Sequence, residues 1–241
     1  MTENIEQPSS NIYQNIDPRN VGIYTAADAA RYLRVPYTTV RSWVFGSKYH
    51  TKIGSKRFEP VIKIPDTKTK LMSFTNLVEL HTLNAFRRVH QLTLDKVRQG
   101  IEYLQHTYKM EHPLAYQKLY TDGADLFIEQ FGKFVNASQC GQLVMKEIIQ
   151  IYLKRIEWDN QCLPAKLYPF TRPQESELPR LIVIDPFVSF GQPVLSGTGI
   201  PTKIIAERYS SGESINHLAH DYNCETLLVE EAIRYELASV A

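Results

Sequence analysis

The side chains with the clearest capacity for chemistry are basic ones gathered near the N-terminus. Residues 29–65 hold eight Lys or Arg residues and a single acid, Glu59, which is a charge of +7 in a chain whose net charge is +1. A local cluster of cations gains free energy on nucleic-acid phosphates by releasing counterions, whatever the overall charge. We therefore predict a DNA-binding surface in and just after this stretch. The expected phosphate contacts are Arg34, Lys48, Lys52, Lys56, Arg57, Lys68 and Lys70.

Within the cluster, a short segment offers side chains that could read DNA bases. Val40, Trp43 and Val44 recur at helical spacing, so they are expected to be buried and to leave the polar residues between them outside. The predicted base-facing residues are Thr38, Thr39, Arg41 and Ser42. Arg41 is the expected reader of guanine, because a guanidinium can donate two hydrogen bonds to the guanine O6 and N7 atoms.

Two short helices must position these side chains. The first has small or apolar residues at i, i+3, i+4 and i+7, namely Ala26, Ala29, Ala30 and Leu33. Thr25 can cap this helix through its hydroxyl, and Pro36 disfavours helical geometry at Val35 and begins a second helix. The pattern predicts a helix-turn-helix. An alanine-rich helical pair also occurs as plain scaffold in many folds, and the scarcity of acids in the cluster favours DNA binding.

The segment after the second helix is expected to add a small β wing. Residues 46–60 are predicted to be a polar, basic connector broken by two glycines. Residues 61–64 and 71–74 have the composition of strands around a turn, so they predict a hairpin whose tip carries Lys68 and Lys70.

The middle of the chain reads as helical scaffold. Thr75 or Asn76 is expected to cap a helix that runs to about residues 88–90, and a regular apolar stripe predicts another helix from Thr93. Further predicted features are a short helix from Pro113, a hairpin within 126–135 and a long amphipathic helix over 142–157. None of them carries recognisable catalytic chemistry, so this region is interpreted as scaffold or as a dimer surface.

Length and composition predict an ordinary globular protein of one large domain or of two to three small ones. Hydrophobic residues make up 43% and charged residues 22% of 241 positions. The predicted parts are a disordered lead-in (1–20), a winged helix-turn-helix (21–92), a helical region (93–162), a proline-rich linker (163–180) and a C-terminal unit (181–241). In the last part a strand at 181–184 precedes three helices in a homeodomain-like arrangement. The predicted fold class is mainly α with small β elements (α+β).

The residues give no evidence for a secreted protein, a membrane protein, a metal site or a phosphate-binding loop. The sequence has no apolar signal core and no run long enough to span a membrane, and its three cysteines are widely spaced. His217 and His220 share a helix face, but no further ligand has suitable spacing for a metal. The glycine turn at 196–199 lacks the G-K-[ST] ending of a phosphate loop. We therefore expect a cytoplasmic protein with no metal, no cofactor, no enzymatic activity and no membrane partner.

The most distinctive text lies near the C-terminus, where a strand ends in Asp-Pro and GQPVLSGTGIPT follows at 191–202. It resembles the domain-of-unknown-function family four-three-three of VapB-like antitoxins, in which G-x-P-x-x-x-G-T-x-I-P precedes a three-helix homeodomain-like unit. The fixed positions are all present: Asp185, Pro186, Gly191, Pro193, Gly197, Thr198, Ile200 and Pro201. The resemblance covers about residues 180–238. The chain departs from the family at Gly199, where Arg is common, and at Thr202, where Val is common.

The N-terminal part resembles the MerR-like winged helix and the DNA-binding domain of longer VapB-like members, with Pro36 where a Ser-type cap is usual. Together the resemblances imply an antitoxin of a type II toxin–antitoxin system. Such a protein binds and neutralises a PIN-like ribonuclease toxin and represses its own operon.

Charge distinguishes the two ends of the chain. Residues 174–241 hold ten acids and four basic residues, a net charge of −6 that makes a poor partner for phosphate. We therefore expect the N-terminal unit to bind double-stranded operator DNA and the C-terminal unit to bind protein, either the toxin or a second copy. The expected protein-interface residues are Gly197, Thr198, Ile200, Pro201, Glu230 and Tyr235.

A homodimer is expected, because two-fold protein symmetry matches palindromic DNA, and the region that dimerises is left open. The alternative function is a free-standing helix-turn-helix transcriptional regulator without a toxin partner.

Overall fold

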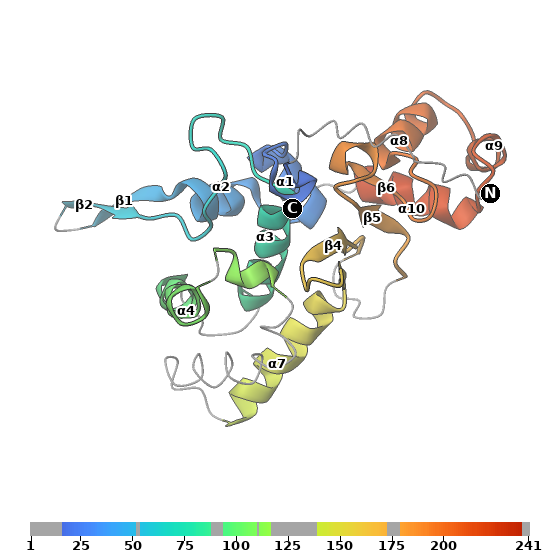
Figure 1. Cartoon of the computed structure of the whole chain (residues 1–241). Helices are drawn as coiled ribbons and strands as arrows, with labels where there is room; N and C mark the ends of the chain where they lie inside the picture. The colour runs from blue at the N-terminus through green and yellow to red at the C-terminus, as the bar shows by residue number, and fades with distance from the viewer. Residues whose placement is uncertain are drawn as a thin grey trace, which may run out of the picture.

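The structure is a computed structural model that describes residues 16–51, 54–87, 94–109, 111–116, 139–172 and 179–237. It is mainly helical, with one two-stranded hairpin and one four-stranded antiparallel sheet, which confirms the predicted fold class. Figure 1 shows the blue N-terminal helices beside the orange and red C-terminal unit, while the β1–β2 hairpin projects from the other side of the molecule.

The N-terminal helix-turn-helix forms as predicted. Its helices are α1 (Ala26–Leu33) and α2 (Tyr37–Phe45). The Thr25 hydroxyl accepts the N–H of Asp28 at 3.1 Å, and the Asp28 carboxylate accepts the N–H of Thr25 at 3.0 Å, which satisfies the first turn of α1. Ala29 and Val40 are 0% exposed and Trp43 is 3% exposed. The small residues therefore let the two helices pack closely, and the predicted burial of Trp43 is confirmed.

The wing lies elsewhere than predicted. Its strands are β1 (Ser47–Thr51) and β2 (Gly54–Phe58). They fall within residues 46–60, which were predicted to be a connector, so that prediction is wrong. Gly46 turns the chain from α2 into β1 at a φ of 73°, and a Cβ atom there would lie 2.3 Å from the carbonyl oxygen of Phe58. Tyr, Thr and Phe in this stretch were the available strand signal.

Residues 61–64 and 71–74 do not form the predicted hairpin strands. The N–H groups of the first two residues both donate to the carbonyl oxygen of Trp43, at 2.7 and 3.2 Å, so this segment satisfies the C-terminal end of α2. Met72 instead forms an isolated bridge with Tyr24. Most of the apolar side chains that suggested strands, namely Ile62, Ile64, Met72 and Phe74, are buried in the same core as the helix-turn-helix.

Helix α3 (Phe74–Arg87) runs through the centre of the molecule, and nearly all of its side chains are buried. Ser73 caps this helix, rather than the predicted Thr75 or Asn76. The Ser73 hydroxyl accepts the N–H of Asn76 at 3.2 Å, and the Asn76 side-chain oxygen accepts the N–H of Ser73 at 3.1 Å. The elements packed on α3 include η1 (Pro18–Asn20), η2 (Pro113–Ala115) and α7 (Gln139–Leu153).

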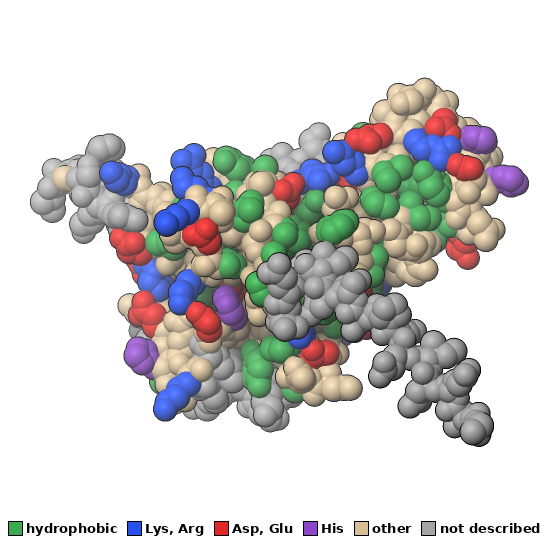
Figure 2. Space-filling view, turned by 45° about the horizontal axis from the view of Figure 1, so that its top comes forward, with side chains coloured by type: hydrophobic (Ala, Val, Ile, Leu, Met, Phe, Trp, Pro, Cys, Tyr) green, Lys and Arg blue, Asp and Glu red, His purple; other side chains and the backbone are tan. Residues whose placement is uncertain are grey.

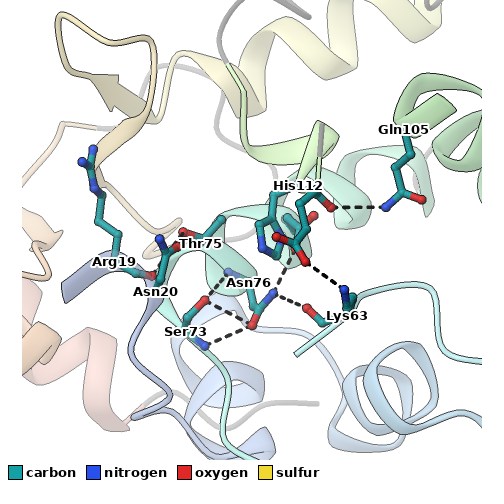
Figure 3. A network of polar contacts seen from close by, with 10 residues as sticks. Arg19, Asn20, Lys63, Ser73, Thr75, Asn76, Gln105 and His112 are labelled. Atoms are coloured by element: carbon teal, nitrogen blue, oxygen red, sulfur yellow. Dashed lines mark hydrogen bonds and ion pairs between the residues drawn. The ribbon is translucent and has the colours of Figure 1, made fainter. Parts of the chain in front are cut away.

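A polar network joins the start of α3 to two other segments (Figure 3). The Asn76 amide donates to the Lys63 carbonyl oxygen at 2.9 Å and to the Glu79 carboxylate at 3.0 Å. His112 Nδ1 lies 3.0 Å from the same carboxylate, and Lys63 forms an ion pair with Glu111 at 2.8 Å. Burial alone would lower the pKa of His112, but its contacts with Glu79 outweigh burial and raise it. The network fixes the segment before α3 against η2.

The predicted disordered lead-in has an ordered end. Asp17 caps η1, and Arg19 forms ion pairs with Asp17 at 2.7 Å and with Asp159 at 2.5 Å. The Thr75 hydroxyl donates to the Arg19 carbonyl oxygen at 3.1 Å. The prediction for residues 1–15 falls outside the described residues.

The described part of the middle region is helical as predicted, with a difference at the end of α7. Helix α4 (Leu94–Tyr108) follows the predicted apolar stripe. Helix α7 ends at Leu153, earlier than predicted, because residues 156–158 form strand β3. The predicted hairpin within 126–135 lies outside the described residues.

A four-stranded antiparallel sheet ties the middle region to the C-terminal unit. In sheet order its strands are β3 (Ile156–Trp158), β4 (Pro164–Leu167), β5 (Ile182–Ile184) and β6 (Pro193–Leu195). Strand β4 lies inside 163–180, the predicted linker, and its Leu167 pairs with Ile184. Part of the predicted linker is therefore a paired strand.

The C-terminal unit contains the three predicted helices. They are α8 (Thr202–Ser210), α9 (Ile215–Asp221) and α10 (Thr226–Leu237), and the turn η3 (Ser189–Gly191) precedes β6. The Ser214 hydroxyl caps α9 as predicted, accepting the N–H of His217 at 3.2 Å. Ile205, Leu218 and Val229 are 0% exposed, so all three helices contribute to one core.

Candidate nucleic-acid interface

Three of the four predicted base-facing residues share one face of α2. Thr38, Arg41 and Ser42 are spaced i, i+3 and i+4. Thr38 and Arg41 are exposed, and Ser42 is half-buried with its hydroxyl bonded to the start of β1. Thr39 is placed differently, because its hydroxyl accepts a hydrogen bond from Arg87 at the end of α3, at 3.3 Å. The open face is therefore centred on Thr38 and Arg41.

The β1–β2 hairpin continues directly from α2 and carries predicted phosphate contacts. Its register places Lys48 directly opposite Arg57, and like charges in that arrangement destabilise a hairpin. The sequence of the hairpin contains no acid to offset them, and Lys48 is exposed. Lys56 also lies in β2, and Lys52 falls outside the described residues. Such a hairpin is suited to an anionic partner.

An open hollow beside α2 brings Arg41 together with Lys63 and Lys70. It has a volume of about 740 Å³ and lies between α2 and the loop after β2, with one acid on its wall. Lys70 and Lys68 are both exposed on the turn of that loop. Sequence reasoning missed Lys63, which is exposed on the rim of the hollow and paired with Glu111.

Four of the predicted DNA contacts have side chains without an ion-pair partner among the described residues. They are Arg41, Lys48, Lys68 and Lys70. A cation without an internal partner can neutralise a phosphate and displace the cations condensed on DNA, and their release favours binding. Arg41 and Lys70 line the same hollow, Lys68 lies on the turn that carries Lys70, and Lys48 lies in the strand that follows α2. We refer to these four residues and the open face of α2 as the basic surface.

Arg34 does not belong to this basic surface. It ends α1 in the left-handed conformation, and its guanidinium donates to the carbonyl oxygens of Arg234 and Tyr235 at 3.4 and 3.5 Å. The guanidinium also lies 5.8 Å from the centre of the Tyr235 ring. Burial lowers the pKa of Arg34. In this structure α10 engages Arg34, so its role as a phosphate contact stays a prediction that the structure does not favour.

The contact of Arg34 is part of a joint between α1 and the C-terminal unit. Arg31 forms an ion pair with Glu236, and the Tyr235 hydroxyl donates to the Tyr32 carbonyl oxygen at 3.0 Å. Tyr235 is 3% exposed, so in this structure it is unavailable to another protein, contrary to its predicted role.

The other predicted protein-interface residues remain accessible. Gly197, Thr198 and Glu230 are exposed, and Ile200 and Pro201 are half-buried. Their role in a protein interface stays a prediction.

All four basic residues of the acidic segment 174–241 contact an acid or a backbone carbonyl oxygen. Arg208 forms ion pairs with Glu213 and Asp221, both at 2.5 Å, which raise the pKa of Arg208 and lower the pKa values of the two acids. The remaining engaged cations are Arg180 on the Lys154 carbonyl, Lys203 on Glu207 and Arg234 on Glu231. Figure 2 shows this pattern at the right of the molecule, where blue side chains lie next to red ones.

Two further observations bear on function classes. Among the described residues, no helix is long and apolar enough to cross a membrane. The same part of the chain contains no group of three or more His, Cys, Asp or Glu side chains arranged to hold a metal ion. His217 and His220 are both exposed, and His217 Nε2 lies 3.5 Å from the Glu213 carboxylate.

Comparison with known families finds a match in each half of the chain. Residues 22–101 match the family model described as "Putative DNA-binding HTH domain", and residues 182–235 match the one described as "Protein of unknown function (DUF433)". The matches cover the helix-turn-helix with its hairpin and the C-terminal three-helix unit. They confirm the predicted pairing of a helix-turn-helix with this C-terminal family.

Similar proteins span nearly the whole chain. A Mycobacterium tuberculosis protein named "Putative antitoxin VapB45" is 29% identical over 219 residues, which is 84% of this chain and 89% of that protein. "Uncharacterized protein Rv2308" from the same organism is 22% identical over 88% of this chain and 89% of its own length. The crystal structure of Rv2018 from Mycobacterium tuberculosis has a TM-score of 0.64 at 24% identity, covering 88% of this chain and 98% of that one. The last likeness shows a shared fold.

Proposed function

We propose that this chain, which joins a helix-turn-helix unit to a C-terminal unit of the DUF433 family, is the antitoxin of a type II toxin–antitoxin system. It binds operator DNA through the N-terminal unit, neutralises a PIN-like ribonuclease toxin through the C-terminal unit, and represses its own operon. The observation that carries the proposal is the contrast in charge pairing. Arg41, Lys48, Lys68 and Lys70 lack ion-pair partners among the described residues, whereas Lys203, Arg208 and Arg234 of the C-terminal unit are each paired with an acid.

On the DNA side, α2 has the size and polarity to enter a major groove. Thr38 and Arg41 then face base edges, and Arg41 donates to guanine O6 and N7. The β1–β2 hairpin, with Lys48 opposite Arg57, follows the phosphate backbone beside that groove.

On the toxin side, charge complementarity supports the assignment. The RNA-binding face of a ribonuclease is expected to be basic, and the C-terminal unit presents exposed acids such as Glu225 and Glu230 on or beside α10. The name of the relative VapB45 supports the same role.

The proposed assembly is a cytoplasmic homodimer on palindromic DNA, with no enzymatic activity of its own.

The decisive experiment measures both partners with the same full-length preparation. The protein is mixed with the PIN-like protein that the proposal predicts to be encoded beside it and with a duplex from its own promoter, and both affinities are recorded. We expect both to bind. The double variant Glu225→Gln/Glu230→Gln should bind the toxin more weakly, mainly through slower association, and keep its operator affinity within about twofold.

Glu102→Gln is the matched control, because Glu102 is an exposed acid on α4, outside the C-terminal unit. It should leave both affinities unchanged. DNA binding without any toxin binding would favour a free-standing regulator, and absence of DNA binding would overturn the proposal.

A further inference from the structure

Two phenylalanine side chains in the loop between β5 and β6 stand in solvent. Phe187 is 62% exposed and Phe190 is 71% exposed, more than any other large hydrophobic side chain in the described residues. Large aromatic side chains account for much of the stability of protein interfaces, and Phe is enriched in them. Such exposure therefore asks for an explanation.

The loop that carries the two rings is held firmly. The N–H of Phe187 donates to the Asp185 side chain at 2.8 Å, and the N–H of Val188 donates to the Asp185 carbonyl oxygen at 3.1 Å. The carbonyl oxygen of Gly191 accepts a buried hydrogen bond from the Tyr24 hydroxyl at 2.9 Å, which ties the end of the loop to the N-terminal unit. The aromatic side chains are thus presented on an ordered support.

The backbone at the second phenylalanine is strained. Phe190 has φ 53° and ψ 35°, and the preceding Ser189 has φ 48°. The left-handed region is unfavourable for residues with a Cβ atom, and especially for a bulky one. Backbone strain of this kind clusters at functional sites, where the surrounding structure enforces it. The loop therefore pays a conformational cost that fixes an exposed aromatic ring in place.

The loop adjoins the turn that contains the predicted interface residues. The Ser189 hydroxyl donates to the carbonyl oxygen of Gly199 at 2.9 Å, and that glycine follows Gly197 and Thr198. The two turns are consequently parts of one surface, which combines exposed aromatic rings with exposed backbone.

We propose that Phe187 and Phe190 are the apolar anchors with which the C-terminal unit binds its protein partner. This inference rests on the proposed function, and the partner is the ribonuclease toxin, which would offer an apolar cleft with a basic rim. Charge selects this occupant. A second copy in a two-fold contact would set one unit of net charge −6 against another, and DNA phosphate would meet the same repulsion.

The test uses variants that remove each ring and preserve the fold. Phe190→Gly removes the aromatic ring and suits the left-handed backbone, so the variant should fold at least as well as the wild type. Phe187→Ser removes the other exposed ring. The probe is the PIN-like protein that the proposed function predicts to be encoded beside this gene. Each variant should bind it about 10- to 100-fold more weakly, as interface anchors do, and should bind promoter DNA as the wild type does.

The matched control is Tyr103→Ser, because Tyr103 is an exposed aromatic residue on α4, far from the loop in sequence. It should leave toxin affinity unchanged, and Phe190→Tyr should retain most of the affinity. If the wild type binds the toxin and both ring-removing variants bind equally well, this inference is wrong while the proposed function stands. If the wild type does not bind the toxin, both the proposed function and this inference are wrong. If the variants lose self-association, the surface binds a second copy instead.

Discussion

The N-terminal and C-terminal units are both small helical bundles, yet they treat their basic side chains in opposite ways. In the N-terminal unit, Arg41 and Lys48 are exposed and have no ion pair within the described residues. In the C-terminal unit, Arg208 lies between Glu213 and Asp221. A cation that is already paired with a carboxylate must exchange that carboxylate for phosphate, so it gains little from displacing the cations condensed on DNA. The two units therefore differ more in the pairing of their charges than in their folds.

The two units also differ in which helix they leave open. The outer face of α2 is accessible at Thr38 and Arg41, whereas the last turn of α10 packs its buried Tyr235 against α1. A groove-binding role for the last turn of α10 would require that joint to break. The open helix and the free cations thus occur in the same unit.

The largest expected effect comes from the core behind the open helix. Trp43→Ala should lower the free energy of unfolding by about 3–5 kcal/mol, because it leaves a cavity at a side chain that is 3% exposed. Denaturant unfolding measures this change. Tyr37→Ala, on the same helix and 49% exposed, is the control and should cost much less. A Trp43 variant with normal stability and altered DNA specificity would mean that α2 presents its other face.

Removing the proposed guanine reader comes next. Arg41→Ala should weaken operator binding by about 1–3 kcal/mol and relax specificity at one base pair, because a bidentate contact to one base is lost. Binding to a set of single-substitution duplexes measures both effects. Lys203→Ala removes an exposed cation that is paired with Glu207 in the C-terminal unit, so it should leave operator binding unchanged. The reverse ranking of these two variants would invert the comparison.

A smaller effect is expected at the joint. Tyr235→Phe removes the hydroxyl that donates to the Tyr32 carbonyl oxygen, and should destabilise the protein by about 1 kcal/mol. Thermal or denaturant unfolding of the full chain is the measurement. Tyr209→Phe removes a hydroxyl from an exposed tyrosine of the same unit and serves as the control. Equal stability of the two variants would argue that the joint does not form in solution.

The smallest effect should come from a single phosphate contact. Lys48→Ala should weaken binding to all sequences about equally and reduce the slope of log affinity against log salt by about 1. A salt titration with specific and random duplexes tests both statements. The control is Lys109→Ala, which removes an exposed cation just after α4. A Lys48 variant with an unchanged salt slope would place the hairpin away from the DNA backbone.

Local signals made much of the helical structure predictable. Thr25 and Ser214 cap α1 and α9 because a side-chain hydroxyl can satisfy a first-turn N–H within its own segment. Thr38 and Arg41 share a face because helical periodicity places them there. The predicted position of the wing is wrong because local signals do not identify the partner of a strand. A strand is specified by its partner, and the apolar residues at 61–64 found theirs at the end of α2 rather than in a hairpin.

The sequence by itself determined the asymmetry of charge, because the positions of Lys, Arg, Asp and Glu along the chain are enough to place +7 at one end and −6 at the other. Only the tertiary structure decided which of those charges remain free. Arg34 was a cation like its neighbours until the fold laid α10 against it, and Arg31 meets Glu236 across 205 positions of sequence. An ion pair depends on distance in space, and the chain folds back over such separations in a way that local spacing does not encode.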